Sequence, residues 1–176
     1  GYVLANRSTA GCGRGCTRDS FVFYRSDVLE PLRVRPRAGT ATLSAVSQVR
    51  WTGSYDRGWS WAYLRQRATG LPVLVASVHL PNEKTRQGER LRRAAARGLA
   101  AHLEARRQAH GLPPLTTVIA GDLNSFGRRQ PNGAHKVIAT AGFTDAHSAP
   151  RRTHARVATI NVTRRHRDPF PARPVR

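Results

Sequence analysis

The sequence is poor in acidic residues, lysine, methionine and long apolar runs. Among its 176 residues it has no Met, two Cys, ten Asp and Glu, and only two Lys. No apolar run approaches the roughly 20 residues that span a bilayer, so we expect no membrane-spanning protein. No period supports a collagen or coiled-coil structure. Residue 1 is Gly, so we expect a processed chain or a fragment. No signal-peptide pattern opens the chain, and its location stays open, with secretion among the alternatives.

The positive charge is almost entirely arginine. The chain has 28 Arg and a net charge of +20, a threefold excess of bases over acids. Such an excess predicts contact with polyanions: nucleic acid, anionic lipid headgroups or phosphate esters. The alternative is a basic surface that binds nothing. A hydrophobic share of 39% is enough for a packed core, so we expect one folded domain over residues 1–176 and no wholly disordered chain.

The two cysteines, Cys12 and Cys16, lie close together in a Gly- and Arg-rich segment. Two thiols cannot complete a four-ligand zinc site, and the nearest histidine is His79, far along the chain. A short-range disulfide in an exported protein and a pair of inert free thiols are both left open.

Hydrophobic periodicity predicts alternating strands and helices. Trp59–Tyr63 alternates in a two-residue period and predicts a strand that forms a hairpin with Val73–Leu80. Apolar residues at i, i+4, i+8 and i+12 predict a helix over 84–109. Further strands are expected at 21–24, 42–51, 116–120 and 157–162, a short helix at 135–141, a loop at 1–19 and an irregular or edge-like segment at 31–40. Strands 73–80 and 116–120 are nearly all apolar, which predicts burial, and the order indicates an α/β fold.

Three polar residues lie at the C-terminal ends of the two apolar strands: His79 at the end of the first, and Asp122 and Asn124 at the end of the second. Active sites of α/β sheets collect at such strand ends. If the chain stays extended, Asp122 and Asn124 project to the same side, where they could hold a hydrated Mg²⁺ and a water near a phosphate. The alternative is that they are turn or cap residues, and that His79 is structural. For Asp145, at the end of the turn that begins at Phe143, the alternative is a capping role.

The ordered motifs Val73–Leu80, a helix opening at Arg86, Val118–Ser125 and Gly142–Ala146 resemble the endonuclease/exonuclease/phosphatase family. The match covers residues 20–147. The family includes deoxyribonucleases, abasic-site endonucleases, sphingomyelinases and inositol-polyphosphate 5-phosphatases. The resemblance implies a four-layer α/β sandwich, here incomplete, made of two packed mixed sheets flanked by helices.

The same resemblance implies Mg²⁺-dependent hydrolysis of phosphate esters by in-line attack of water, with Mn²⁺ or Ca²⁺ as alternative ions. Asp122 resembles the residue that orients or deprotonates the water. Asn124 resembles the partner of that residue, which contacts phosphate or a metal-bound water. Asp122 and Asn124 are both candidate metal ligands. His79 resembles the strand-end histidine that contacts the phosphate, and Asp145 a supporting acid.

The sequence also departs from the family pattern. It has no Gln-Glu pair, which carries the family's metal-ligating Glu, and no Ser-Asp-His near its end; Asp168 is the only acid after Asp145. We therefore expect a chain that lacks both ends of a longer domain and is itself inactive or weakly active. A degenerate homologue is the alternative.

The sequence thus favours a monomeric, metal-dependent phosphodiesterase that acts on nucleic acid. A phospholipid or phosphomonoester hydrolase of the same family is one alternative. Another is a non-catalytic module that binds nucleic acid through its Arg-rich helix and through stacking on Trp51, Trp59 and Trp61. For Trp59 and Trp61 we favour a place in the core.

Overall fold

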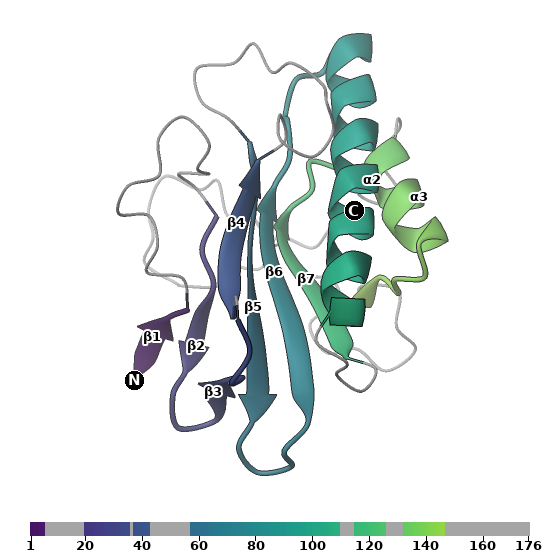
Figure 1. The fold of residues 1–176 in the computed structure, drawn as a ribbon. Coiled ribbons are helices and arrows are strands. Elements are labelled where there is room, and N and C mark those ends of the chain that lie inside the picture. Colours follow the sequence, from purple (N-terminus) through teal and green to yellow (C-terminus); the bar gives the residue numbers. More distant parts are fainter. Residues whose placement is uncertain (6–19, 36, 43–56, 110–114, 126–131, 147–176) are drawn as a thin grey trace. The chain divides into compact units, whose positions relative to one another are not determined.

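The computed structural model describes residues 1–5, 20–35, 37–42, 57–109, 115–125 and 132–146. These form a small two-stranded sheet, a five-stranded sheet and two helices (Figure 1). The elements are β1 (Tyr2–Leu4), β2 (Phe23–Arg25), β3 (Leu29–Pro31), β4 (Ala38–Thr42), β5 (Gly58–Gln66), β6 (Pro72–His79), α2 (Arg86–Gln108), β7 (Thr116–Asp122) and α3 (Gly133–Thr140).

The chain divides into two compact units, Gly1–Ala141 and Gly142–Arg176. All of these elements belong to the first unit, and residues 142–146 are the described part of the second. The single domain expected over residues 1–176 stays a prediction. No described helix has the length and apolar character that crossing a membrane requires.

The larger sheet has the order β3-β5-β6-β7, with β4 beside β3 on the same edge of β5. The hairpin β5–β6 is antiparallel, as predicted, whereas β6 and β7 run parallel. Parallel neighbours need a crossover, and α2 supplies it; Figure 1 shows α2 lying along the sheet with α3 beside it. The α/β class is confirmed.

The edge formed by β3 and β4 explains the irregular pattern expected at 31–40. Both strands pair with β5, and Pro31 is the last residue of β3. Proline has no amide hydrogen to donate and so is confined to edges and breaks of a sheet. Thr42, the first residue of the strand expected at 42–51, is the last residue of β4. Residues 43–51 lie outside the described residues.

The core lies on both faces of β5. Trp59, Trp61 and Tyr63 face α2: Trp59 and Trp61 stack edge-on or tilted against His102, and the Tyr63 hydroxyl donates to the Arg106 carbonyl. Trp59 and Trp61 are fully or almost fully buried. They therefore belong to the core and do not stack on nucleic acid. Trp51 lies outside the described residues.

The opposite face of β5 packs against the small sheet. Ala62 and Leu64 form a buried cluster with Val22 and Tyr24, which flank or lie in β2. The described residues therefore show a helical layer and two sheets in contact. The loop expected at 1–19 is wrong at its start, because Tyr2–Leu4 forms a strand, β1, that pairs with β2. Cys12 and Cys16 lie outside the described residues.

The predicted burial of 116–120 is wrong. Thr116, Val118 and Ala120 of β7 are exposed, with Val118 44% accessible. Among the described strands β7 pairs only with β6, and its covered face is the one that carries Thr117 and Ile119. An apolar run shows that a strand can be buried on both faces, but it cannot show whether another layer is there to cover the second face.

Candidate active site

The parallel pairing of β6 and β7 brings the predicted site residues together. His79, the last residue of β6, is the register partner of Asp122, the last residue of β7. Their side chains approach to 3.9 Å between His79 Nε2 and Asp122 Oδ2. The Asp122 side chain is 48% exposed and that of His79 27%, so both can be reached from solvent. This is the strand-end position expected from the sequence.

A buried arginine sets the orientation of His79. Arg57, just before β5, lies with Nη1 at 2.6 Å from His79 Nδ1. An arginine side chain can only donate, so Nδ1 accepts and the neutral ring carries its proton on Nε2, toward Asp122. Sequence reasoning missed Arg57, because nothing local distinguishes it among 28 arginines. The one available signal is its position directly before a strand that pairs with β6.

The chain does not stay extended after β7. Asn124 has φ 48°, in the left-handed region, and its amide donates to Asp122 Oδ1 at 2.7 Å. Asn adopts this conformation more readily than most residues, and an Asp side chain often accepts from the amide two residues on. The extended geometry that would project both side chains to one side is therefore not what the structure shows. Both residues have a turn role.

Asn124 also ties the two strand ends together. Its Nδ2 donates to the Leu80 carbonyl at 2.8 Å, and the Leu80 amide donates to the Asp122 carbonyl at 2.8 Å. The segment after β6 is thereby fixed against the segment after β7. Asn124 thus holds His79 and Asp122 in register, whatever its side-chain oxygen does toward a ligand.

A buried ion pair supports the same region from α2. Arg92, 1% exposed, pairs with Glu89 and donates to the carbonyls of Pro81 and Glu83 at 3.1 and 2.6 Å. Glu89 Oε1 accepts from the amide of Gly133, the first residue of α3, at 2.8 Å. This pair therefore fastens both the loop after His79 and the start of α3. Sequence reasoning missed it, although the i, i+3 spacing of Glu89 and Arg92 was visible.

The described residues offer a limited set of metal ligands. In the part of the chain that the structure describes, no three His, Cys, Asp or Glu side chains cluster as a metal site. Mg²⁺ commonly keeps several waters and binds through one or two carboxylates plus substrate phosphate. The exposed Asp122 carboxylate fits such a single attachment. Asp145 belongs to the second compact unit, and its supporting role stays a prediction.

No protein-family model and no curated protein matches the chain. Solved structures do match. An endonuclease/exonuclease/phosphatase family protein from Bacteroides thetaiotaomicron aligns over 81% of this chain with 20% identity and a TM-score of 0.56. A mannosyl-6-phosphatase from the same species aligns over 81% with 20% identity and the same TM-score. The chain spans about half of these structures, 47% and 49% of their lengths. Its fold is that of endonuclease/exonuclease/phosphatase family proteins, as the sequence resemblance implied.

Proposed function

We propose that the protein hydrolyses phosphate esters, with Mg²⁺ as cofactor and nucleic acid as substrate. The observation that carries the proposal is the pairing of His79 with Asp122 at the carboxyl ends of two parallel strands, in a fold of this type. The net charge of +20 favours a polyanionic substrate over a small phosphate ester. Mg²⁺, held in part by Asp122, would neutralise charge on the phosphoryl group.

In this mechanism each side chain has a distinct task. Asp122 Oδ2, the oxygen that does not accept from Asn124, orients the attacking water or takes its proton. The Nε2–H of His79 donates to a phosphoryl oxygen and stabilises its growing charge. Arg57 acts as a positioning residue, because its bond to Nδ1 keeps the His79 proton on Nε2.

The test is a plasmid-nicking assay of the full-length protein with Mg²⁺ and with EDTA. We expect Asp122→Ala to lower the rate about 10²–10⁴-fold, the range for general acid–base groups. Asn124→Ala should cost about 10²–10³-fold, and His79→Ala should reduce turnover without unfolding the protein. Asp27→Ala is the control, since this exposed carboxylate pairs only with Arg25 among the described residues and lies on the β2–β3 connection.

Circular dichroism must first show that each variant is folded. A folded Asp122→Ala protein with parental, Mg²⁺-dependent nicking would reject the proposed site. Hydrolysis of p-nitrophenyl phosphate but not of bis-p-nitrophenyl phosphate would replace the diesterase proposal with a phosphomonoesterase. Binding without hydrolysis of either would favour the non-catalytic module.

A further inference from the structure

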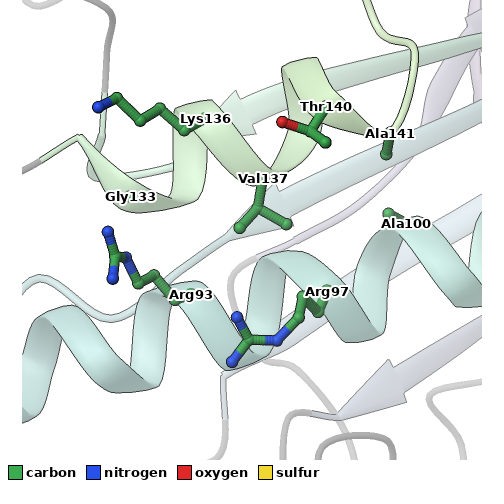
Figure 2. Close-up of a pocket in the computed structure, with 8 residues that line it drawn as sticks. All are labelled: Arg93, Arg97, Ala100, Gly133, Lys136, Val137, Thr140 and Ala141. Atoms are coloured by element: carbon green, nitrogen blue, oxygen red, sulfur yellow. The ribbon is translucent and has the colours of Figure 1, made fainter.

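A basic groove lies between α2 and α3, outside the candidate active site. Its cavity has a volume of about 420 Å³. Figure 2 shows its lining: Arg93, Arg97 and Ala100 from α2, and Gly133, Lys136, Val137, Thr140 and Ala141 from α3 and its end. The walls are aliphatic, with three cations and one hydroxyl. No aromatic side chain and no carboxylate is among the lining residues.

Two of the three cations have no counter-charge in the described part of the chain. Arg93 lies 3.5 Å from Glu89 Oε1, which also accepts from the Gly133 amide, while Glu89 Oε2 pairs with Arg92. Arg97 and Lys136 make no ion pair or side-chain hydrogen bond with any described residue. In Figure 2 the charged ends of all three extend toward the N-terminal ends of the helices, the direction in which helical side chains lean.

The groove continues a line of arginines along α2. Arg86, Arg90, Arg93 and Arg97 recur at i, i+4, i+7 and i+11 and are all exposed, so they share one face of the helix. At 1.5 Å per residue this basic stripe is about 16 Å long. It starts at the end of α2 that follows β6: only five residues separate His79 from the N-cap Thr85.

We infer that the groove and the basic stripe bind successive backbone phosphates of a nucleic acid strand that reaches past the active site. A pocket alone would suit a small anion, whereas cations repeated at each helical turn suit a polymer of regular charge. The groove has no aromatic side chain to serve as a stacking platform and offers cations and a hydroxyl, so the contact is with phosphate and is independent of base sequence. The Thr140 hydroxyl adds a neutral donor to a phosphate oxygen.

The experiment compares two double variants that remove the same charge. Arg97→Gln/Lys136→Gln neutralises the groove and spares Arg93, which touches the Glu89 pair. Arg33→Gln/Arg35→Gln is the matched control, because both arginines are exposed near β3 and β4, on the sheet edge opposite β7. The probe is a fluorescein-labelled 20-nucleotide duplex, bound in EDTA and followed by fluorescence anisotropy over a salt series.

We expect the groove variant to bind about tenfold more weakly than the parent protein at low salt, because two phosphate contacts are lost, and this difference should shrink as the salt concentration rises. The magnitude of its salt slope should fall by about 2, and that of the control by less than about 1. Equal losses in the two variants would overturn the inference, because only total charge would then matter. It would also be overturned if the groove variant lost binding to phosphatidylserine vesicles but kept the duplex.

This inference goes beyond the proposed function, because binding in EDTA needs no cleavage. If the parent protein does not nick plasmid DNA, but the groove variant still binds the duplex more weakly than the control variant, only the proposed function is rejected. If the parent protein nicks plasmid DNA, but the two double variants bind the duplex equally well, only the groove inference is rejected. Asp122→Ala, with its effect confined to hydrolysis, should keep the parental binding curve or bind slightly more tightly.

Discussion

Gly121 is the residue that allows β7 to lie against the end of β6 at the candidate site. Its φ is +122°, and a Cβ atom there would come within 2.1 Å of the Val78 carbonyl oxygen. Both the backbone conformation and the space therefore require glycine. The next residue is Asp122, so the geometry of the carboxylate depends directly on this close approach.

Gly121→Ala should destabilise the protein by about 3 kcal/mol or more, because strain at a positive φ adds to a backbone clash. Urea denaturation followed by circular dichroism measures it. Gly70→Ala is the matched control: Gly70 also has a positive φ, +72°, but a Cβ there meets nothing within 4 Å. It should cost only about 1 kcal/mol. Equal effects at the two positions would show that the close approach to Val78 is not constraining.

At this scale the sequence predicted residue types at strand ends but not their partners. His79 and Asp122 were predicted because each lies at the end of an apolar strand. Arg57 was not, because its bond to His79 spans 22 residues and depends on the register of β5 against β6. The sequence left two interpretations of Asn124 open, a turn residue and a ligand of metal or phosphate, because spacing alone does not distinguish them. Its φ of 48° establishes the turn and leaves its role toward phosphate a proposal.

Among the elements, α2 has the largest structural role. Its apolar stripe covers the sheet, and its buried Glu89 and Arg92 fasten the loop after β6 and the start of α3. Both charges are out of water, so each depends on the other for compensation. The N-cap Thr85 accepts from the Gly88 amide at 3.0 Å, which fixes where the helix begins.

Arg92→Leu should lower the free energy of unfolding by about 3–5 kcal/mol, because Glu89 would stay buried without its partner. Chemical denaturation measures the change. The double variant Glu89→Gln/Arg92→Leu should lose less than the sum of the two single changes, since neither charge is then left unpaired. Additive losses would mean that the two residues act independently and would contradict their role as a coupled ion pair.

The packing of α2 on β5 also buries a titratable side chain, His102. His102 lies against Trp59 and Trp61, and its Nε2 is buried without a hydrogen-bond partner in the described structure. Burial, and then the nearby Arg106 charge, lower the pKa of His102 from 6.5 to about 4. Arg106 is the one charged group that faces it in the described residues, lying over the Trp61 ring at 4.8 Å.

Stability should therefore fall as the pH drops from about 6.5 to about 4, because the unfolded chain takes up this proton and the folded chain does not. Part of the ring is reached by solvent, so we expect about 1–2 kcal/mol and not the full linkage value. Thermal unfolding across this range measures the loss. His102→Phe should flatten the curve between these pH values; an unchanged slope would assign the loss to other groups.

The order of elements was predictable because each depends on its own sequence period. The helix expected at 84–109 is α2, Arg86–Gln108, and the helix expected at 135–141 starts two residues earlier at Gly133. The exposure of β7 was not predictable in this way. Burial of a strand depends on what packs on it, and that is decided by segments distant in the sequence.

For the molecule as a whole, the excess of arginine is the property most directly connected to a partner. Arginines serve two kinds of role here: Arg57 and Arg92 are buried and position other groups, whereas the basic stripe on α2 is exposed. Only exposed cations can release counterions from a polyanion on binding. A net charge of +20 therefore predicts nucleic-acid affinity through the exposed subset, independent of base sequence.

The protein should bind duplex DNA without sequence preference and with strong salt dependence. If it neutralises about five phosphates, log K should fall with log salt at a slope of about −4 to −5. Anisotropy titrations with two duplexes of unrelated sequence, in EDTA, measure the slope and the preference together. Each counterion displaced by an arginine contributes almost one unit of slope, so the slope counts contacts, whereas affinity alone does not. Affinity that stays constant from low to moderate salt would show that the charge does not act on nucleic acid, and the exposed arginines would then form only a solvated surface.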